Sequence, residues 1–308
     1  MRLLAVNYHY YRTERPSSGI YPISPVSFAT QISNIAANWT IANECQVLEA
    51  IDGDSSTDVS LCLITFDDGL KEQMRAVHWL RTQGFAAVCY IPTAPLTESC
   101  VLDVHKLHMI RASRPDVELV TDLTARFGVA FTGIDPDAAS AQYPLDDADA
   151  QRLKYFLNFV LDLRSRRDWV DRQFEQLVGN EAAVASALYM DRADVCFLAK
   201  HGMIGTHSHS HLALAMLDNA AISLEIGKSL DVIQDITGVR VRGISYPYGG
   251  PTAVDENVGR VAEEFGLSYG LSMRSGVNGP SVRRNRMLLK RVDTNDVSAV
   301  AGLPNRLQ

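Results

Sequence analysis

Leu61-Cys-Leu-Ile-Thr-Phe-Asp67-Asp68-Gly69 is an apolar run that ends abruptly in two adjacent carboxylates and a glycine. Its β-branched and aromatic residues predict a strand buried on both faces, as is typical of parallel sheets. Sites in parallel sheets form at the carboxyl ends of strands, where Asp67 and Asp68 stand. Because Asp-Asp-Gly also suits a simple turn, this stretch alone leaves a turn and a site as equal alternatives.

The segments around this stretch predict an α/β fold. A helix is predicted at residues 70–82, ended by Gly84, and a strand at residues 86–91, ended by Pro92. Strand, helix and strand in this order form a βαβ unit and therefore a parallel sheet. Further strands are predicted at residues 3–8, 203–206, 241–245, 267–273 and 287–292, and further helices at residues 25–39, 219–237 and 254–265.

Residues 94–202 have a different pattern, with helical periodicity that is strongest at residues 151–178 and 181–201. We expect one domain over residues 1–308, with this stretch as a helical insertion. Asp103-Val-His105-Lys106-Leu-His108 opens the insertion, and its two histidines are spaced to share a helix face. A helix with solvated histidines and lysine is one interpretation, and a substrate contact at His105 is the other.

The amino-acid composition argues against some classes of function. With 308 residues, of which 46% are hydrophobic, the chain can bury a large core, and its net charge of -7 argues against nucleic-acid binding. The five cysteines are an odd number without CxxC spacing, which indicates reduced core thiols. The first apolar segment is too short for a signal peptide and no later stretch could span a bilayer, so we expect a soluble, cytoplasmic protein.

Three histidines follow a predicted strand directly, in His207-Ser208-His209-Ser210-His211. Catalytic zinc is typically held by three protein ligands, and two histidines with one carboxylate are a known set. If the segment turns helical after the strand, His207 and His211 can reach one point while His209 points elsewhere. One aspartate of the Asp67-Asp68 pair would complete such a site and the other would stay free as a base, whereas a fortuitous polar loop is the alternative.

Three motifs carry a resemblance to a known family. Thr65-Phe66-Asp67-Asp68-Gly69, the histidine segment 207–211 and Tyr246-Pro247-Tyr248-Gly249 reproduce in order the first three motifs of the polysaccharide deacetylases, also called NodB-homology or carbohydrate esterase family four. The sequence resembles this family over residues 59–92 and 203–292, and the insertion is not covered.

The resemblance implies a distorted (β/α) barrel with fewer than eight complete repeats. It also implies Asp67 as general base, the Tyr248 backbone amide as part of an oxyanion site, and a divalent metal bound by Asp68, His207 and His211. Zinc is the expected metal, although the ligand set also tolerates cobalt, nickel or iron.

The chain departs from the family pattern in two places. No histidine follows His211, although the family has its general acid in a late strand. Some members, such as the poly-N-acetylglucosamine deacetylases, have a circularly permuted order, and residues 6–9 fit the displaced strand. We therefore expect the first strand beside the last, with His9 aimed at the metal as the acid.

The second departure is Ser245, which stands where the family has an arginine. Arg291 and Asp293 are candidates to orient Asp67 in its place. Pro247, Arg291 and His105 are also candidate substrate contacts.

The expected function is a metal-dependent N-deacylase, a deacetylase or deformylase, that acts on an amino sugar of a cytoplasmic glycan precursor in surface polysaccharide (lipopolysaccharide) biosynthesis. One alternative is hydrolysis of a non-sugar amide or cyclic C–N bond. Another is a catalytically inactive carbohydrate-binding homologue. The acyl group, the sugar and the oligomeric state stay open.

Overall fold

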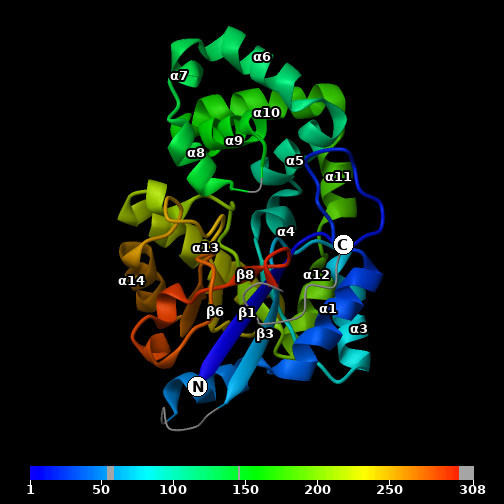
Figure 1. Cartoon of the computed structure of the whole chain (residues 1–308), viewed down its shortest axis with the longest axis vertical. Coiled ribbons are helices and arrows are strands. Elements are labelled where there is room, and N and C mark those ends of the chain that lie inside the picture. Colours follow the sequence, from blue (N-terminus) through cyan, green and yellow to red (C-terminus); the bar gives the residue numbers. More distant parts are fainter. Residues whose placement is uncertain (54–58, 145, 298–308) are drawn as a thin grey trace. The chain divides into compact units, whose positions relative to one another are not determined.

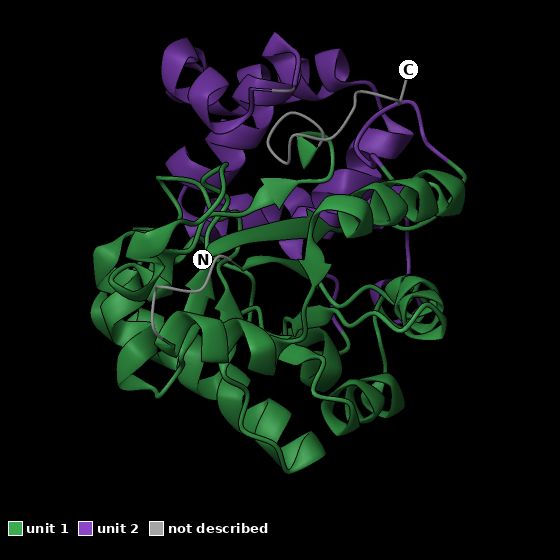
Figure 2. Cartoon of the chain, turned by 60° about the horizontal axis from the view of Figure 1, so that its bottom comes forward, with its two compact units in different colours: residues 1–14, 22–99, 185–308 green, residues 15–21, 100–184 purple. Residues whose placement is uncertain are grey.

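The computed structural model describes residues 1–53, 59–144 and 146–297. The chain divides into two compact units, which are described separately below (Figure 2). Unit 1 comprises residues 1–14, 22–99 and 185–308, and unit 2 comprises residues 15–21 and 100–184. The assignment of the whole chain to one domain stays a prediction.

Unit 1 is built on a parallel sheet with the strand order β7-β6-β5-β4-β3-β1-β8, and β2 pairs with β3 (Figure 1). All of these pairs are parallel. The strands are β1 Arg2–Tyr8, β2 Thr40–Ile41, β3 Ser60–Phe66, β4 Val88–Ile91, β5 Ile204–Thr206, β6 Gly243–Ser245, β7 Tyr269–Leu271 and β8 Val292–Asp293. The predicted α/β class is confirmed.

Helices connect these strands. The helices of unit 1 are α1 Pro25–Asn38, α2 Glu44–Asp52, α3 Gln73–Thr82, α4 Ala94–Glu98, α12 Arg192–Lys200, α13 Asn219–Thr237 and α14 Glu256–Glu264, with 3₁₀ turns Leu214–Met216, Pro280–Arg283 and Arg286–Leu288. Ser24 caps α1 through its side chain, and Gly238 ends α13 in the left-handed conformation. Helix α2 was not predicted from the sequence.

The last described strand was predicted incorrectly. Residues 286–288 form a 3₁₀ turn instead of the strand expected at residues 287–292, and β8 begins only at Val292. Leu289 makes a single parallel bridge to Leu271 of β7, and Val292 pairs with Val6 of β1. This segment therefore connects the two ends of the sheet, which curves into a distorted barrel. The first strand lies beside the last described one as expected, while the circular permutation itself stays a prediction.

Side chains alternate between the two faces of each strand, and this alternation decides which residues reach the barrel interior. On β1, Leu3 and Ala5 pack in the interior cluster, whereas Leu4 and Val6 pack in the outer cluster with the helices. Asn7 lies an even number of residues after Leu3 and Ala5, so its side chain is on the same face of the strand. It therefore faces the interior at the carboxyl end of β1.

The same alternation holds on the neighbouring strand. Leu61 and Leu63 of β3 belong to the interior cluster, so Thr65 and Asp67 follow them inward, and Asn7 is in register with Thr65. On the other strands, a residue that lies an even number of positions from an interior residue also faces inward. This alternation brings further polar side chains to the interior. The inward-facing polar residues at the carboxyl-terminal edge of the sheet include Asn7, Thr65, Asp67, His207, Ser245 and Arg291.

The barrel interior below these polar residues is filled by two tyrosines. A Cβ at Gly205 or Gly243 would overlap the rings of Tyr90 and Tyr269, so glycine at these two positions makes room for the rings. The two hydroxyl oxygens lie 2.8 Å apart, and Tyr269 donates to Glu44 of α2 at 2.8 Å. This polar chain closes the interior toward α2.

Unit 2 is helical, with α5 Asp103–Ser113, α6 Asp116–Phe127, α7 Val129–Thr132, α8 Pro136–Gln142, α9 Ala148–Tyr155, a π-helical turn at Phe156–Val160 and α10 Leu163–Leu177. α11 Glu181–Leu188 leads back to unit 1. The helix block predicted at residues 151–178 is interrupted at Leu161, which is extended, before Asp162 caps α10.

The interpretation of the α5 side chains as solvated is wrong, and the expected core placement of the cysteines holds only in part. His105 and Lys106 of α5 are buried and not solvated, and Lys106 pairs with Asp171 and Glu181. None of the five cysteines, all of which lie in the described residues, is in a disulfide, and only Cys62 and Cys89 of them are buried. Within the described residues, no helix is both long and apolar enough to cross a membrane.

Candidate active site

Asp68, His207 and His211 form a buried group at the carboxyl ends of β3 and β5. Oδ1 of Asp68 lies 3.4 Å from Nε2 of His207 and 3.3 Å from Nε2 of His211. Bonds of about 2.1 Å to a tetrahedral ion set neighbouring ligand atoms roughly 3.4 Å apart. The spacing and the donor set therefore fit a zinc-like divalent ion.

The loop after β5 brings the two histidine rings together without a helix. Residues 207–213 are not helical, so the condition that the sequence analysis set for this contact is not met, yet the rings of His207 and His211 have centroids 4.8 Å apart. Ser208 and His211 have positive φ angles of 59° and 57°, which fold the chain back within four residues. As predicted, the His209 side chain points away from the candidate metal-binding site, and it contacts Thr93 and Glu98.

Backbone strain is concentrated at this site. Non-glycine residues with positive φ are uncommon, and the described part of the chain has them at Asp68, Ser99, Ser208, His211 and Tyr248. All of these except Ser99 lie in the three sequence motifs. Such strain persists where the surroundings over-determine the conformation, as they often do at functional sites.

A backbone carbonyl orients His207. Its Nδ1 lies 2.6 Å from the carbonyl oxygen of Ser245, which can only accept, so Nδ1 carries a hydrogen and Nε2 is left to face Asp68. Burial alone lowers the pKa of His207, but the carboxylates of Asp67 and Asp68 outweigh burial and raise this pKa above its usual value. The ring is thus prepared for a cation on its Nε2 side.

Asp67 is held by donors from three other strands or their ends. Arg291 donates from its two terminal nitrogens to Oδ1 at 2.9 Å and to Oδ2 at 2.6 Å. Ser245 donates to Oδ2 at 3.0 Å, and Asn7 donates to the same atom at 3.1 Å. Burial raises the pKa of Asp67, yet the positive charge of Arg291, followed by His207, lowers it below its usual range. Asp67 is therefore an ionised carboxylate.

Arg291 thus occupies the role that the missing motif arginine left open. The arginine reaches Asp67 from the residue before β8, and its side chain is fully buried. Asp293, the other candidate, instead accepts hydrogen bonds from Asn295. Ser245 contacts the carboxylate that the missing arginine would contact, but it supplies no charge.

The expected proton donor also lies near Asp67. His9 is half-buried at the end of β1, and its Nε2 is 3.4 Å from the Asn7 amide nitrogen that also donates to Asp67. Gln73 donates to the backbone oxygens of both His9, at 2.9 Å, and Asp67, at 2.6 Å. Asn7 and Gln73 therefore connect these two residues through side chain and backbone.

Two further motif residues flank the metal group. Tyr248 has a φ of 61°, and its ring centroid lies 5.0 Å from that of His211. Pro247 before it is buried. His105 belongs to unit 2, where its ring is 5.8 Å from that of His108. The roles expected of Pro247, Tyr248 and His105 stay predictions.

Asn7 and Gln73 are site residues that were not predicted from the sequence. The alternation on β1 could have revealed Asn7, because it is the polar residue in a strand whose other inward residues are apolar. Gln73, which opens α3, had no comparable signal.

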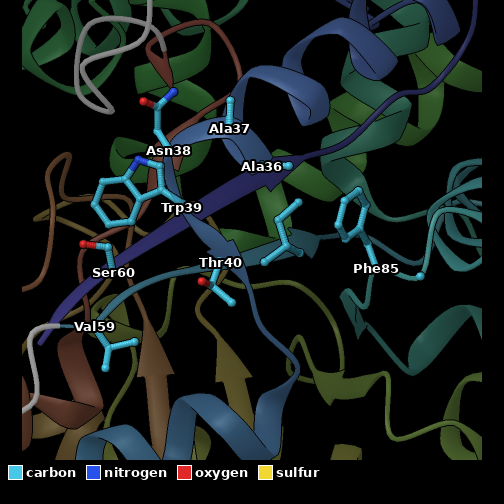
Figure 3. A pocket seen from close by; sticks show the side chains of 10 residues that line it. Ala36, Ala37, Asn38, Trp39, Thr40, Val59, Ser60 and Phe85 are labelled. Carbon is cyan, nitrogen blue, oxygen red and sulfur yellow. The ribbon is translucent and has the colours of Figure 1, made fainter.

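A hollow lies at the amino ends of the strands, away from the candidate site at their carboxyl ends. Figure 3 shows that Trp39, Thr40, Ser60 and Phe85 line it. Thr40 and Ser60 are the first residues of β2 and β3, whereas the candidate site lies at the carboxyl ends. We do not assign this hollow to the chemistry.

Comparison with known proteins agrees with this geometry. A family model described as Polysaccharide deacetylase matches residues 190–270, which include the second and third motifs. No curated protein matches this sequence. Within the described structure, the matched range contains His207, His211 and Ser245 of the site.

Solved structures share the fold. Streptococcus pyogenes deacetylase PplD, in complex with acetate, aligns with a TM-score of 0.59 at 13% identity and covers 99% of this chain and 94% of its own. IcaB from Ammonifex degensii gives 0.58 at 13% identity, with 96% and 93% covered. The BpsB deacetylase domain from Bordetella bronchiseptica gives 0.56 at 16% identity, with 95% of both chains covered. Identities this low establish the fold alone.

Family model, fold and site together define a polysaccharide deacetylase-like hydrolase with a candidate Asp-His-His metal site. The resemblance to the polysaccharide deacetylases that the motifs indicated is confirmed by the family model over residues 190–270, and the solved structures confirm the fold.

The buried pair between Arg291 and Asp67 yields a prediction for stability. Replacing Arg291→Met leaves an uncompensated buried carboxylate and should lower the free energy of unfolding by about 3–5 kcal/mol. On an Asp67→Asn background, the same replacement should lower the free energy of unfolding much less, because no unpaired charge is then left buried. Urea unfolding of the metal-free wild type, both single variants and the double variant measures the coupling. Additive effects would contradict a direct pair.

Proposed function

We propose that this chain is a metal-dependent N-deacylase that removes an acetyl or formyl group from an amino sugar, with zinc as its divalent ion. The observation that carries the proposal is the Asp68-His207-His211 group with ionised Asp67 next to it in sequence. A bound divalent ion would polarise the acyl carbonyl and acidify a water molecule. The remaining roles belong to residues at or after the carboxyl ends of the strands.

Asp67 is the proposed base, and its hydrogen bonds indicate which oxygen takes the proton. Oδ2 accepts from Asn7, Ser245 and Arg291, whereas Arg291 is the one donor to Oδ1 within the described residues. A carboxylate oxygen has about two acceptor positions. Oδ1 therefore retains a position for the proton of the attacking water.

The other roles follow the course of amide hydrolysis. The water oxygen bonds to the acyl carbon, the carbonyl oxygen becomes negative, and the Tyr248 backbone amide stabilises that charge. When the C–N bond breaks, the nitrogen needs a proton, which we assign to His9 as the acid. The products are a carboxylate and a free amine.

Arg291 is better explained as a positioning residue than as a substrate contact, because its terminal nitrogens both donate to Asp67. Pro247 is kept as a proposed substrate contact, whereas His105, which is buried in unit 2, stays a prediction from the sequence. We further propose an acylated amino sugar of a cytoplasmic glycan precursor in surface polysaccharide biosynthesis. The support for an amino sugar is the family's link to acetylated sugars.

Release of acetate and formate from a panel of N-acylated amino sugars tests the proposed reaction. We expect one of these acids to form, with activity abolished by a chelator and restored by stoichiometric Zn²⁺. Asp68→Ala should lose the metal, because it removes one of three ligands. Activity only on non-sugar amides would favour the alternative hydrolase. An inactive protein without stoichiometric metal would favour a carbohydrate-binding homologue.

The role of His9 makes a separate prediction. His9→Ala should lower kcat by about 10²–10⁴-fold, the usual contribution of an acid or base, while metal content stays unchanged. Steady-state kinetics and elemental analysis of the same preparation provide the two readouts. His201→Ala, on the exposed end of α12, is the matched control and should match the wild type. Loss of metal from His9→Ala would make His9 a ligand instead.

A further inference from the structure

We propose that His209, the middle histidine of the loop 207–211, is a positioning residue that holds the two candidate metal-binding histidines in place. Its side chain points away from the metal group and anchors the loop to the protein on the other side. The proposal rests on the proposed function for its metal readout, but its effect on the loop can be measured without metal.

His209 uses both ring nitrogens. The residue is 3% exposed, and its Nδ1 lies 2.8 Å from Oγ1 of Thr93, which directly precedes α4. Its Nε2 lies 2.9 Å from Oε1 of Glu98 at the end of the same helix. One imidazole ring therefore spans the whole length of α4.

The direction of these hydrogen bonds follows from Glu98. Lys228 of α13 also contacts Oε1 of Glu98, at 2.8 Å. The hydrogen bonds from Lys228, and then from His209, lower the pKa of Glu98, which is thus an ionised acceptor. Nε2 of His209 must donate to it. Nδ1 faces the Thr93 hydroxyl, which can donate or accept.

The backbone of the same loop is held at the same place. The Ala94 amide donates to the His209 oxygen at 3.0 Å, and the Thr93 amide donates to the Ser208 oxygen at 3.3 Å. On the other side, Oε2 of Glu225 accepts from the amides of His209, at 3.2 Å, and Ser210, at 2.7 Å. The loop is therefore fixed between α4 and α13.

This anchoring is what the loop conformation requires. Ser208 and His211 are both in the left-handed region, where a non-glycine residue stays only if its surroundings impose it. His209 lies between these two residues. Its hydrogen bonds therefore help to maintain the reversal that brings His211 back to His207.

The test compares variants that remove one or both of the His209 side-chain contacts with a control that removes neither. His209→Phe keeps a ring of similar size and removes both hydrogen bonds, and Thr93→Val removes the Nδ1 partner with little change of shape. Lys228→Met is the matched control, because it contacts Glu98 but not His209. Zn²⁺ affinity is measured by competition with a chromophoric chelator. Hydrogen exchange of the amides of residues 207–211 is measured in the metal-free proteins.

We expect His209→Phe to weaken Zn²⁺ binding by about 10–100-fold, as removal of a group that orients metal ligands commonly does. Thr93→Val should also weaken Zn²⁺ binding. Lys228→Met should change it by less than about threefold, because exposed ion pairs contribute little. In metal-free His209→Phe, exchange should accelerate in the loop and stay unchanged in β3.

Two results would overturn the proposal. One is wild-type Zn²⁺ affinity in both His209→Phe and Thr93→Val. The other is hydrogen exchange that is unchanged in the loop, or faster throughout the sheet, which would make His209 an ordinary core residue. If the wild type binds no Zn²⁺, the proposed function fails, and the exchange measurement alone decides whether His209 holds the loop.

Discussion

The buried ion pair between Arg291 and Asp67 is the interaction on which the rest of the site depends. Asp67 and Asp68 are consecutive and both buried, so without a nearby cation the two carboxylates would raise each other's pKa and one would take up a proton. Arg291 provides that charge through two hydrogen bonds to Asp67. Asp68 is then left to face His207 and His211.

This pair also links the site to the closure of the barrel. Arg291 lies between Leu289, which bridges to β7, and β8, which pairs with β1. The segment that joins the two ends of the sheet therefore also carries the counterion of the proposed base. A fault in this closure would disturb the fold and the chemistry together.

Each of the two aspartates has a different set of neighbours, and this difference supports the proposed division of roles. Asp67 is surrounded by donors from Asn7, Ser245 and Arg291, whereas Asp68 has a φ of 75° that turns its side chain toward the histidine rings. The adjacent residues therefore face different partners. A base and a metal ligand can stand side by side because the backbone is strained between them.

Much of the fold was predictable, because β3 and its neighbours are apolar runs whose polar residues come directly after the strand. The motifs also indicated Asp68, His207 and His211 as a group. The contact of Arg291 with Asp67 spans 224 residues, and the sequence could only offer Arg291 as one of two candidates.

Other features had no local signal. The left-handed residues of the histidine loop are Ser208 and His211 rather than glycine, so the sequence suggested only a helical turn as a way to bring His207 and His211 together. The strand expected at residues 287–292 proved to be mostly a 3₁₀ turn and a single bridge, because that apolar run pairs with two different strands over short lengths.

The most direct test of the account is a crystal structure of the Zn²⁺-loaded protein with anomalous scattering data. The account predicts one strong peak within about 2.0–2.3 Å of Oδ1 of Asp68 and of Nε2 of His207 and His211, with Asp67 still bonded to Arg291. A peak elsewhere, or Asp67 turned from Arg291 to bind the ion itself, would contradict it.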